Sequence, residues 1–369
     1  MSRTVPLLDL RREYVALRAE LQEEWAKVFS TMHLLKGAHV AAFEQEIATY
    51  IGTRYAVGVA SGTDALLLSL KGLGVGRGDE VLLHANAFVA ALEAVHHLEA
   101  RPVLVDVAED HFGPDLDQLD WHAGPRTRAV IVVHLYGLPV PMPPLVDWCT
   151  QHDFALVEDC SHAHGARWQG QKVGSFGRAG CFSAGVVKNL GAYGDAGFVT
   201  TDDEGLALQL RLLQAHGQRK KNDHELYGFN SRLDELQAAV LRVKLRYLDA
   251  RNERRRSIAA YYRERFARLP VSVPTEPEGA VGVYHQFVLR TRDRDRLQQY
   301  LREQGVETGI HYPVPLHLQP AWGRYYGTRP QLPRAEVLAR EILSLPVFPD
   351  LTDAEVEHVA ESVCRFFQR

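Results

Sequence analysis

Cysteine is scarce in this sequence. Its 369 residues include four, Cys149, Cys160, Cys181 and Cys364, and no two of them form a C-x-x-C pair. This spacing gives no disulfide framework, and a chain of this length buries a core large enough to fold without disulfides or a structural metal. We therefore expect a protein of a reducing compartment, the cytoplasm.

Long apolar runs and an excess of positive charge are also missing. No window approaches 18 uncharged apolar residues, and residues 1–14 contain no apolar stretch, so we expect neither a transmembrane helix nor a signal peptide. The formal net charge of −4 argues against a nucleic-acid partner. We interpret the basic clusters Arg251–Arg256 and Arg219–Lys221 as solvated surfaces.

The first part of the chain alternates β-rich runs with helical patterns. Several runs are almost continuously apolar, which is typical of strands covered by helices on both faces of a parallel sheet. The expected strands are Tyr55–Ala60, Glu80–His84, Pro102–Asp106, Ala129–His134, Phe154–Glu158, Gly180–Ser183 and Gly197–Thr201. Helical patterns at Thr63–Leu73, Val89–Leu98 and Met142–His152 separate them. This alternation predicts an α/β sandwich.

The pattern changes after Ser231. Apolar residues then recur every three or four positions, which predicts one long helix from Ser231 to about Leu269. We expect this helix to link a large domain, residues 1–245, to a small α+β domain, residues 246–369. The small domain is expected to contain strands at Tyr284–Arg290 and Val306–Ile310, and helices at Asp295–Gln304, Arg334–Leu343 and Asp353–Phe367.

Lys188 stands in an apolar, glycine-rich stretch, Phe182–Gly197. A lysine normally keeps its ammonium group in water, so this one is either at a loop edge or buried. A buried lysine binds its proton less tightly and can attack a carbonyl carbon as a free amine.

Other candidate residues follow the expected strands. Ser61, Gly62 and Thr63 open a helix, where backbone N–H groups form either an anion site or an ordinary cap. Asp159 ends a strand at the sheet edge where ligands bind, and it either holds a cationic nitrogen or caps the next segment. Phe88 either covers a ring or packs in the core.

His162 and His164 follow Asp159, but no further ligand completes a metal site, and we expect no metal. Taken together, a lysine, an anion site, a buried aspartate and an aromatic ring are what pyridoxal 5'-phosphate requires.

With these residues the sequence resembles the DegT/DnrJ/StrS-type sugar aminotransferases, which are fold-type I enzymes dependent on pyridoxal phosphate. The resemblance runs from Val5–Leu10 to Leu343–Pro346. Its most specific motifs are Ala60–Leu66, Glu158–Asp159 with His164–Ala166, Phe182–Ser183 with Lys188–Gly191, Gly228–Leu233, and His311–Pro313 with Pro315–His317.

The resemblance implies a role for each matching residue. Lys188 would bind the cofactor covalently and move the proton, Asp159 would hold the pyridine nitrogen, and Phe88 would stack on the ring. The phosphate would be held by Gly62, Thr63, Ser183 and, from the neighbouring subunit, Asn230, which implies a homodimer with shared active sites. The substrate side would be formed by Tyr193, Arg232, His311, Tyr312 and His317.

The sequence departs from the family pattern in two places. Ala184–Val187 replace the bulkier residues that often precede the lysine, which affects the shape of the sugar pocket. His162 replaces a glutamine that contacts the 3-oxygen of the cofactor, and an imidazole can make the same contact.

The resemblance implies transfer of an amino group from an amino acid, expected to be L-glutamate, to a keto-sugar. The stretch after Lys188 favours a nucleotide-linked 3-keto-6-deoxyhexose. A 4-keto nucleotide sugar, another cyclic ketone, and a regulatory protein of the same fold without turnover remain alternatives. Lys188 argues against a related dehydratase, in which histidine replaces the lysine. Gly72–Gly76 ends a helix rather than opening one, which argues against a dinucleotide-binding dehydrogenase.

Overall fold

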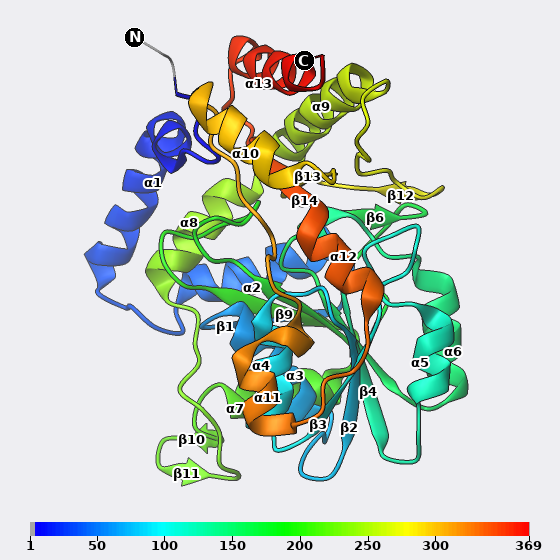
Figure 1. The fold of residues 1–369 in the computed structure, drawn as a ribbon. Coiled ribbons are helices and arrows are strands. Elements are labelled where there is room, and N and C mark those ends of the chain that lie inside the picture. Colours follow the sequence, from blue (N-terminus) through cyan, green and yellow to red (C-terminus); the bar gives the residue numbers. More distant parts are fainter. Residues whose placement is uncertain (1–3, 369) are drawn as a thin grey trace.

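Seven strands form the central sheet, in the order β1-β9-β8-β5-β4-β2-β3 (Figure 1). The structure is a computed structural model that describes residues 4–368. The strands are β1 (Tyr55–Val59), β2 (Glu80–His84), β3 (Arg101–Val105), β4 (Thr127–Val133), β5 (Ala155–Asp159), β8 (Ala179–Ser183) and β9 (Gly197–Thr201). Only β9 runs against its neighbours in this sheet, which confirms the mostly parallel sheet expected from the sequence.

Helices cover both faces of this sheet. Leu83 and Ile131 belong to the core shared with α3, α4 and α7, whereas Leu82 and Val130 face α5 and α6, and all four are fully buried. Successive strand residues point to opposite faces, so a strand buried on both sides has no polar alternation. The helices up to residue 245 are α1 (Leu10–Thr31), α2 (Ala38–Ile51), α3 (Gly62–Gly72), α4 (Val89–His97), α5 (Leu116–His122), η1 (Leu135–Gly137), α6 (Met142–Gln151), α7 (Glu204–Leu213) and α8 (Glu235–Leu245).

The C-terminal part has a core of its own, in which Tyr262, Phe287 and Val359 are buried. It contains α9 (Leu248–Phe266), β13 (Phe287–Arg290), α10 (Arg294–Glu303), η2 (Leu316–Leu318), α11 (Pro320–Tyr326), α12 (Pro333–Glu341), β14 (Ile342–Leu345) and α13 (Asp353–Phe367). Two further small sheets consist of β6 (Arg167–Trp168), β7 (Gln171–Lys172) and β12 (Ala280–Val281), and of β10 (Gln218–Lys220) and β11 (Asp223–His224).

The expected long helix from Ser231 to Leu269 is wrong. The chain forms two helices that meet at Arg246 and Tyr247, because α8 packs on α1 and α2 while α9 packs on α13. The predicted domain boundary after residue 245 falls in this turn. The division itself stays a prediction, and residues near Val5 pair with Val306 across it.

Two further expectations in the C-terminal part are wrong. Residues 306–310 do not form a strand, because Val306 and Gly309 make only isolated bridges, to Val5 and Ser344. The helix expected to reach Leu343 ends at Glu341, since the next residues pair with β13 as strand β14. Across residues 4–368, no helix combines the length and the apolar character needed to span a membrane.

Candidate active site

Asp159 and Lys188 lie at the ends of neighbouring strands. Asp159 is the last residue of β5 and is 5% exposed, and Lys188 lies in the turn after β8. Burial lowers the pKa of Lys188 to about 8, although the nearby Asp159 carboxylate acts in the opposite direction. The amine is therefore much more often neutral near pH 7 than that of a solvated lysine, as a nucleophile requires.

The N-terminus of α3 forms a cradle beside the end of β8. A Cβ atom at Gly62 would lie 2.5 Å from Cβ of Ser183, so only glycine fits this close approach. Ser61 caps the helix by accepting the N–H of Asp64, and the N–H groups of Gly62 and Thr63 lie in the first turn, where the helix supplies no acceptor. A phosphate group fits this arrangement.

Histidines surround the amine of Lys188. Its charge acts on the imidazoles of His162, His164, His285 and His311, and burial is the main reason that the pKa of each lies below its ordinary value. The pKa of His164 falls to about 3. These rings are therefore neutral at pH 7, and each has one donor and one acceptor nitrogen.

Hydrogen bonds assign the tautomers of two of these rings. His162 Nδ1 accepts the N–H of Tyr136 at 3.3 Å, which leaves its Nε2 as the donor. His285 Nδ1 lies 3.1 Å from Oδ1 of Asn189, whose amide nitrogen donates to Asn252 and to Val283. The proton of His285 is therefore on Nδ1, and its Nε2 is an acceptor. The ring centroids of His162 and His285 lie 4.5 Å apart.

Two aromatic residues stand at the open side of this site. The ring of Phe88, which is 51% exposed, lies 5.5 Å from the ring of Tyr312. Burial raises the pKa of Tyr312, and the Asp159 carboxylate adds to this effect. Tyr136 connects His162 with His311, since its N–H donates to His162 and its hydroxyl donates to the carbonyl of His311.

The other predicted residues are placed differently. Asn230 is exposed and Arg232 is partly exposed, and the hydroxyl of the intervening Ser231 accepts the N–H of Ala60 beside the cradle. The ring of Tyr193 packs on Tyr14 and Trp25, under the ammonium group of Lys244.

His317 is fully buried, 3.3 Å from the carboxylate of Glu336, and no contact with Lys188 is seen for it or for Tyr193 within residues 4–368. Their substrate roles remain predictions. His285 and Tyr136 were not found from the sequence, because each is an isolated residue with no motif spacing.

A buried group outside the predicted site combines His134, Glu158 and Cys160, whose ligand atoms lie within 4.8 Å of one another. Glu158 accepts three backbone N–H groups, from Gly174, Phe176 and Gly177, and its carboxylate also faces His134 Nε2 at 3.1 Å. His134 Nδ1 accepts the N–H of Val140. Since these donors and acceptors satisfy one another, the group is better explained as a support for the end of β5 than as a metal site.

The arrangement around Lys188 fits pyridoxal phosphate. The cradle at Gly62 accommodates a phosphate, and Asp159 supplies a buried carboxylate for a pyridinium nitrogen. Lys188 is partly buried, and its amine is weakly basic. The donor Nε2 of His162 suits an oxygen on the ring.

Comparison with known proteins gives one consistent result. Residues 15–364 match the model of the DegT/DnrJ/EryC1/StrS aminotransferase family. The chain is 44% identical to a dTDP-3-amino-3,4,6-trideoxy-alpha-D-glucose transaminase of Streptomyces venezuelae, covering 99% of this chain and 97% of the relative. It is 40% identical to a UDP-N-acetyl-3-dehydro-alpha-D-glucosamine 3-aminotransferase of Acidithiobacillus ferrooxidans, over 98% and 97% of the two chains.

A solved structure has nearly the same fold. The S. venezuelae protein DesV, crystallised in complex with a ketimine intermediate, superposes with a TM-score of 0.97 at 43% identity, and 99% of each chain is covered. The agreement includes both the sheet and the C-terminal part.

Proposed function

The chain belongs to the DegT/DnrJ/EryC1/StrS aminotransferase family and is a sugar aminotransferase, and from this we propose that it moves an amino group from L-glutamate to a nucleotide-linked 3-keto-6-deoxyhexose. The observation that carries the proposal is the position of Lys188, which lies beside the buried Asp159 and the cradle at Gly62, where burial lowers its pKa to about 8. We propose the cytoplasm as its location, in line with four free cysteines.

Pyridoxal phosphate, when bound, supplies a carbonyl carbon for the amine and a ring that withdraws electrons from the carbon that loses a proton. Lys188 Nζ would take this proton from the α-carbon of the amino acid and return it on the cofactor side. Asp159 would keep the ring nitrogen protonated, since its buried carboxylate favours a neighbouring positive charge.

The neutral histidines position these groups without competing for the proton. His162 would donate from Nε2 to the ring oxygen, while the acceptor Nε2 of His285 faces the same region. Because burial keeps the pKa of both well below the ordinary value, neither ring becomes a cation beside Lys188 near pH 7. The exposed Phe88 and the partly exposed Tyr312 would cover the ligands at the open side.

The proposed position of amination rests on the relatives. The names of the two relatives describe transamination at the 3-position of a nucleotide-linked sugar. In this chain, Ala184–Val187 leave small side chains next to Lys188, and Val186 and Val187 are 38% and 45% exposed. We propose that this space accommodates part of the sugar.

We also propose a homodimer in which Asn230 binds the phosphate of the partner's cofactor. Asn230 is exposed in the single chain, on the same loop as Tyr227, which is 97% exposed. A large apolar ring in this position is typical of a surface that another chain covers.

The visible spectrum of the purified holoprotein tests cofactor, donor and acceptor in sequence. We expect glutamate to remove the absorbance of the bound aldehyde form, and a 3-keto nucleotide sugar to restore it. Lys188→Ala should abolish both changes. Restoration by 4-keto sugars alone would refute the 3-keto assignment, and full activity of Lys188→Ala would refute the role of the lysine.

A further inference from the structure

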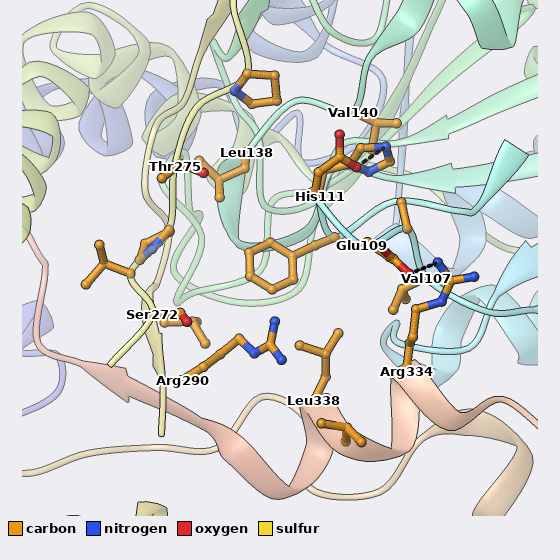
Figure 2. A pocket seen from close by; sticks show the side chains of 18 of the residues that line it. Val107, Glu109, His111, Leu138, Val140, Ser272, Thr275, Arg290, Arg334 and Leu338 are labelled. Carbon is orange, nitrogen blue, oxygen red and sulfur yellow. Dashed lines mark ion pairs between the residues drawn. The ribbon is translucent and has the colours of Figure 1, made fainter. Parts of the chain in front are cut away.

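A separate cavity lies between the sheet and the C-terminal part (Figure 2). Its volume is about 610 Å³, a size typical of small-molecule sites. It is lined by residues 107–112 after β3, residues 138–140 after η1, residues 272–275 and 277, and residues of β13 and α12. None of the residues predicted to bind cofactor or substrate lines it, so it is distinct from the site of Lys188.

Arg290 points into this cavity with an unused donor (Figure 2). Its Nη2 donates to the Glu341 carboxylate at 3.0 Å, which fixes the guanidinium group. Its Nε is buried and has no hydrogen-bond partner among the described residues. A buried N–H of a charged group that lacks an acceptor costs free energy, and an anion in the cavity would remove this cost.

Hydroxyl groups accompany Arg290 on the same wall. Ser272 and Arg290 exchange backbone hydrogen bonds of 2.9 and 2.8 Å, and residues paired in this way project their side chains to the same side. Thr275 lines the cavity from the same segment (Figure 2). Within residues 4–368, neither hydroxyl has a side-chain hydrogen bond, so both are available to a ligand.

The remaining walls decide what kind of anion fits. Phe112 lines the cavity with its aromatic ring. Apolar side chains such as Val140 and Leu338 line it as well (Figure 2). Arg334, the second arginine, is already bound by Asp115 and Glu109.

The carboxylates at the rim of the cavity limit the charge of a ligand. The side chains of Glu109 and Asp110 are 86% and 85% exposed, and both line the cavity. Their charge disfavours a diphosphate or another multiply charged ligand.

We propose that this cavity is a binding site for a small monoanion with an apolar ring. Its carboxylate or similar group would accept hydrogen bonds from Arg290 and Ser272, and its ring would pack against Phe112. The proposal concerns binding alone and does not depend on the proposed transamination.

Fluorine NMR of the holoprotein tests the site with 4-(trifluoromethyl)benzoate, and with 4-(trifluoromethyl)benzyl alcohol as the neutral counterpart. We expect the benzoate to bind saturably. The alcohol should bind at least about tenfold more weakly, since it has no charge to pair with a guanidinium. Arg290→Gln should weaken benzoate binding by about tenfold, whereas Arg292→Gln, two residues away and exposed, should leave it unchanged.

A second variant locates the site independently of Arg290. Thr275 is exposed at the wall of the cavity, on the same segment as Ser272, so Thr275→Trp should narrow the cavity without disturbing the core, and should weaken benzoate binding. If Thr275→Trp and Arg290→Gln both bind the benzoate with the affinity of the wild type, the benzoate occupies another place. This result would overturn the proposal. Absence of saturable benzoate binding to the wild type would overturn it as well.

Discussion

The backbone N–H of Tyr136 donates to Nδ1 of His162, and this hydrogen bond fixes the imidazole as a neutral ring with its proton on Nε2. A protonated His162 would lose this acceptor. The structure therefore keeps Nε2 of His162 as a hydrogen-bond donor.

The buried histidines make the protein sensitive to mild acid. The pKa is lowered to about 4 for His84 and to about 3 for His164, and lies well below its ordinary value for His162 and His285. Below pH ~6.5 the unfolded chain binds protons that the folded chain does not, so the free energy of unfolding should fall as the pH decreases, by about 1.4 kcal/mol per pH unit for each histidine.

Urea unfolding between pH 7.5 and 5 measures this effect. This range lies above the one in which Glu355 contributes, because Arg12 lowers the pKa of that carboxyl to about 2. In His164→Gln, the free energy of unfolding should change less steeply with pH, by about 1.4 kcal/mol per pH unit, because one titrating histidine is missing. A free energy of unfolding that is unchanged or higher at pH 5 would contradict the expectation.

Lys188 should titrate near pH 8 in the cofactor-free protein. The rate at which this protein captures pyridoxal phosphate, followed by absorbance, should rise with pH through that value and then level off. Asp159→Asn should move the midpoint to lower pH, because the carboxylate is the group that raises the pKa of Lys188. A midpoint near 10.5, the ordinary lysine value, would contradict the buried position of the amine.

Gly62→Ala should weaken cofactor binding by about tenfold or more, since the new Cβ would lie 2.5 Å from Ser183 Cβ and 2.9 Å from its Cα. The backbone on one side of the cradle has to move to relieve this overlap. Gly76→Ala is the matched control, because a Cβ there meets no atom within 4 Å. Equal dissociation constants for pyridoxal phosphate in the two variants would refute the cradle.

Asn230 should act across the proposed dimer. Lys188→Ala and Asn230→Ala homodimers should each have little activity, but a mixture allowed to exchange subunits should recover about one quarter of wild-type activity, because half of the dimers then contain one complete site of two. If Asn230 serves the site of its own chain, no complete site forms and mixing restores nothing.

The sheet was predictable because each strand is recognisable from the apolar pattern of its own residues. Glu80–His84 was placed correctly, since every residue of a strand covered on both faces is apolar or buried. Helix α13 was predicted with the bounds that it has, Asp353–Phe367, and in the structure Thr352 caps its start. These signals depend only on neighbours in the sequence.

The rest depends on partners that are distant in the sequence. The run Ile342–Leu345 looks like the end of a helix, and it becomes a strand because Phe287–Arg290 lies beside it. His285 is positioned by a hydrogen bond to Asn189, which lies almost a hundred residues earlier in the chain. No spacing in the sequence predicts that contact. Lys188, Asp159 and Gly62 could be proposed as site residues from the sequence because motifs surround them.

The pairing of Val5 with Val306 has a consequence for synthesis on the ribosome. Val306, the partner of Val5, is made some 300 residues after it, and His311 and Tyr312 follow Val306 closely. A nascent chain has to keep this first segment unpaired while the sheet folds behind it. The active site is therefore completed only after the strands of the sheet have been made, and we expect cofactor capture to wait for the segment that carries His311 and Tyr312.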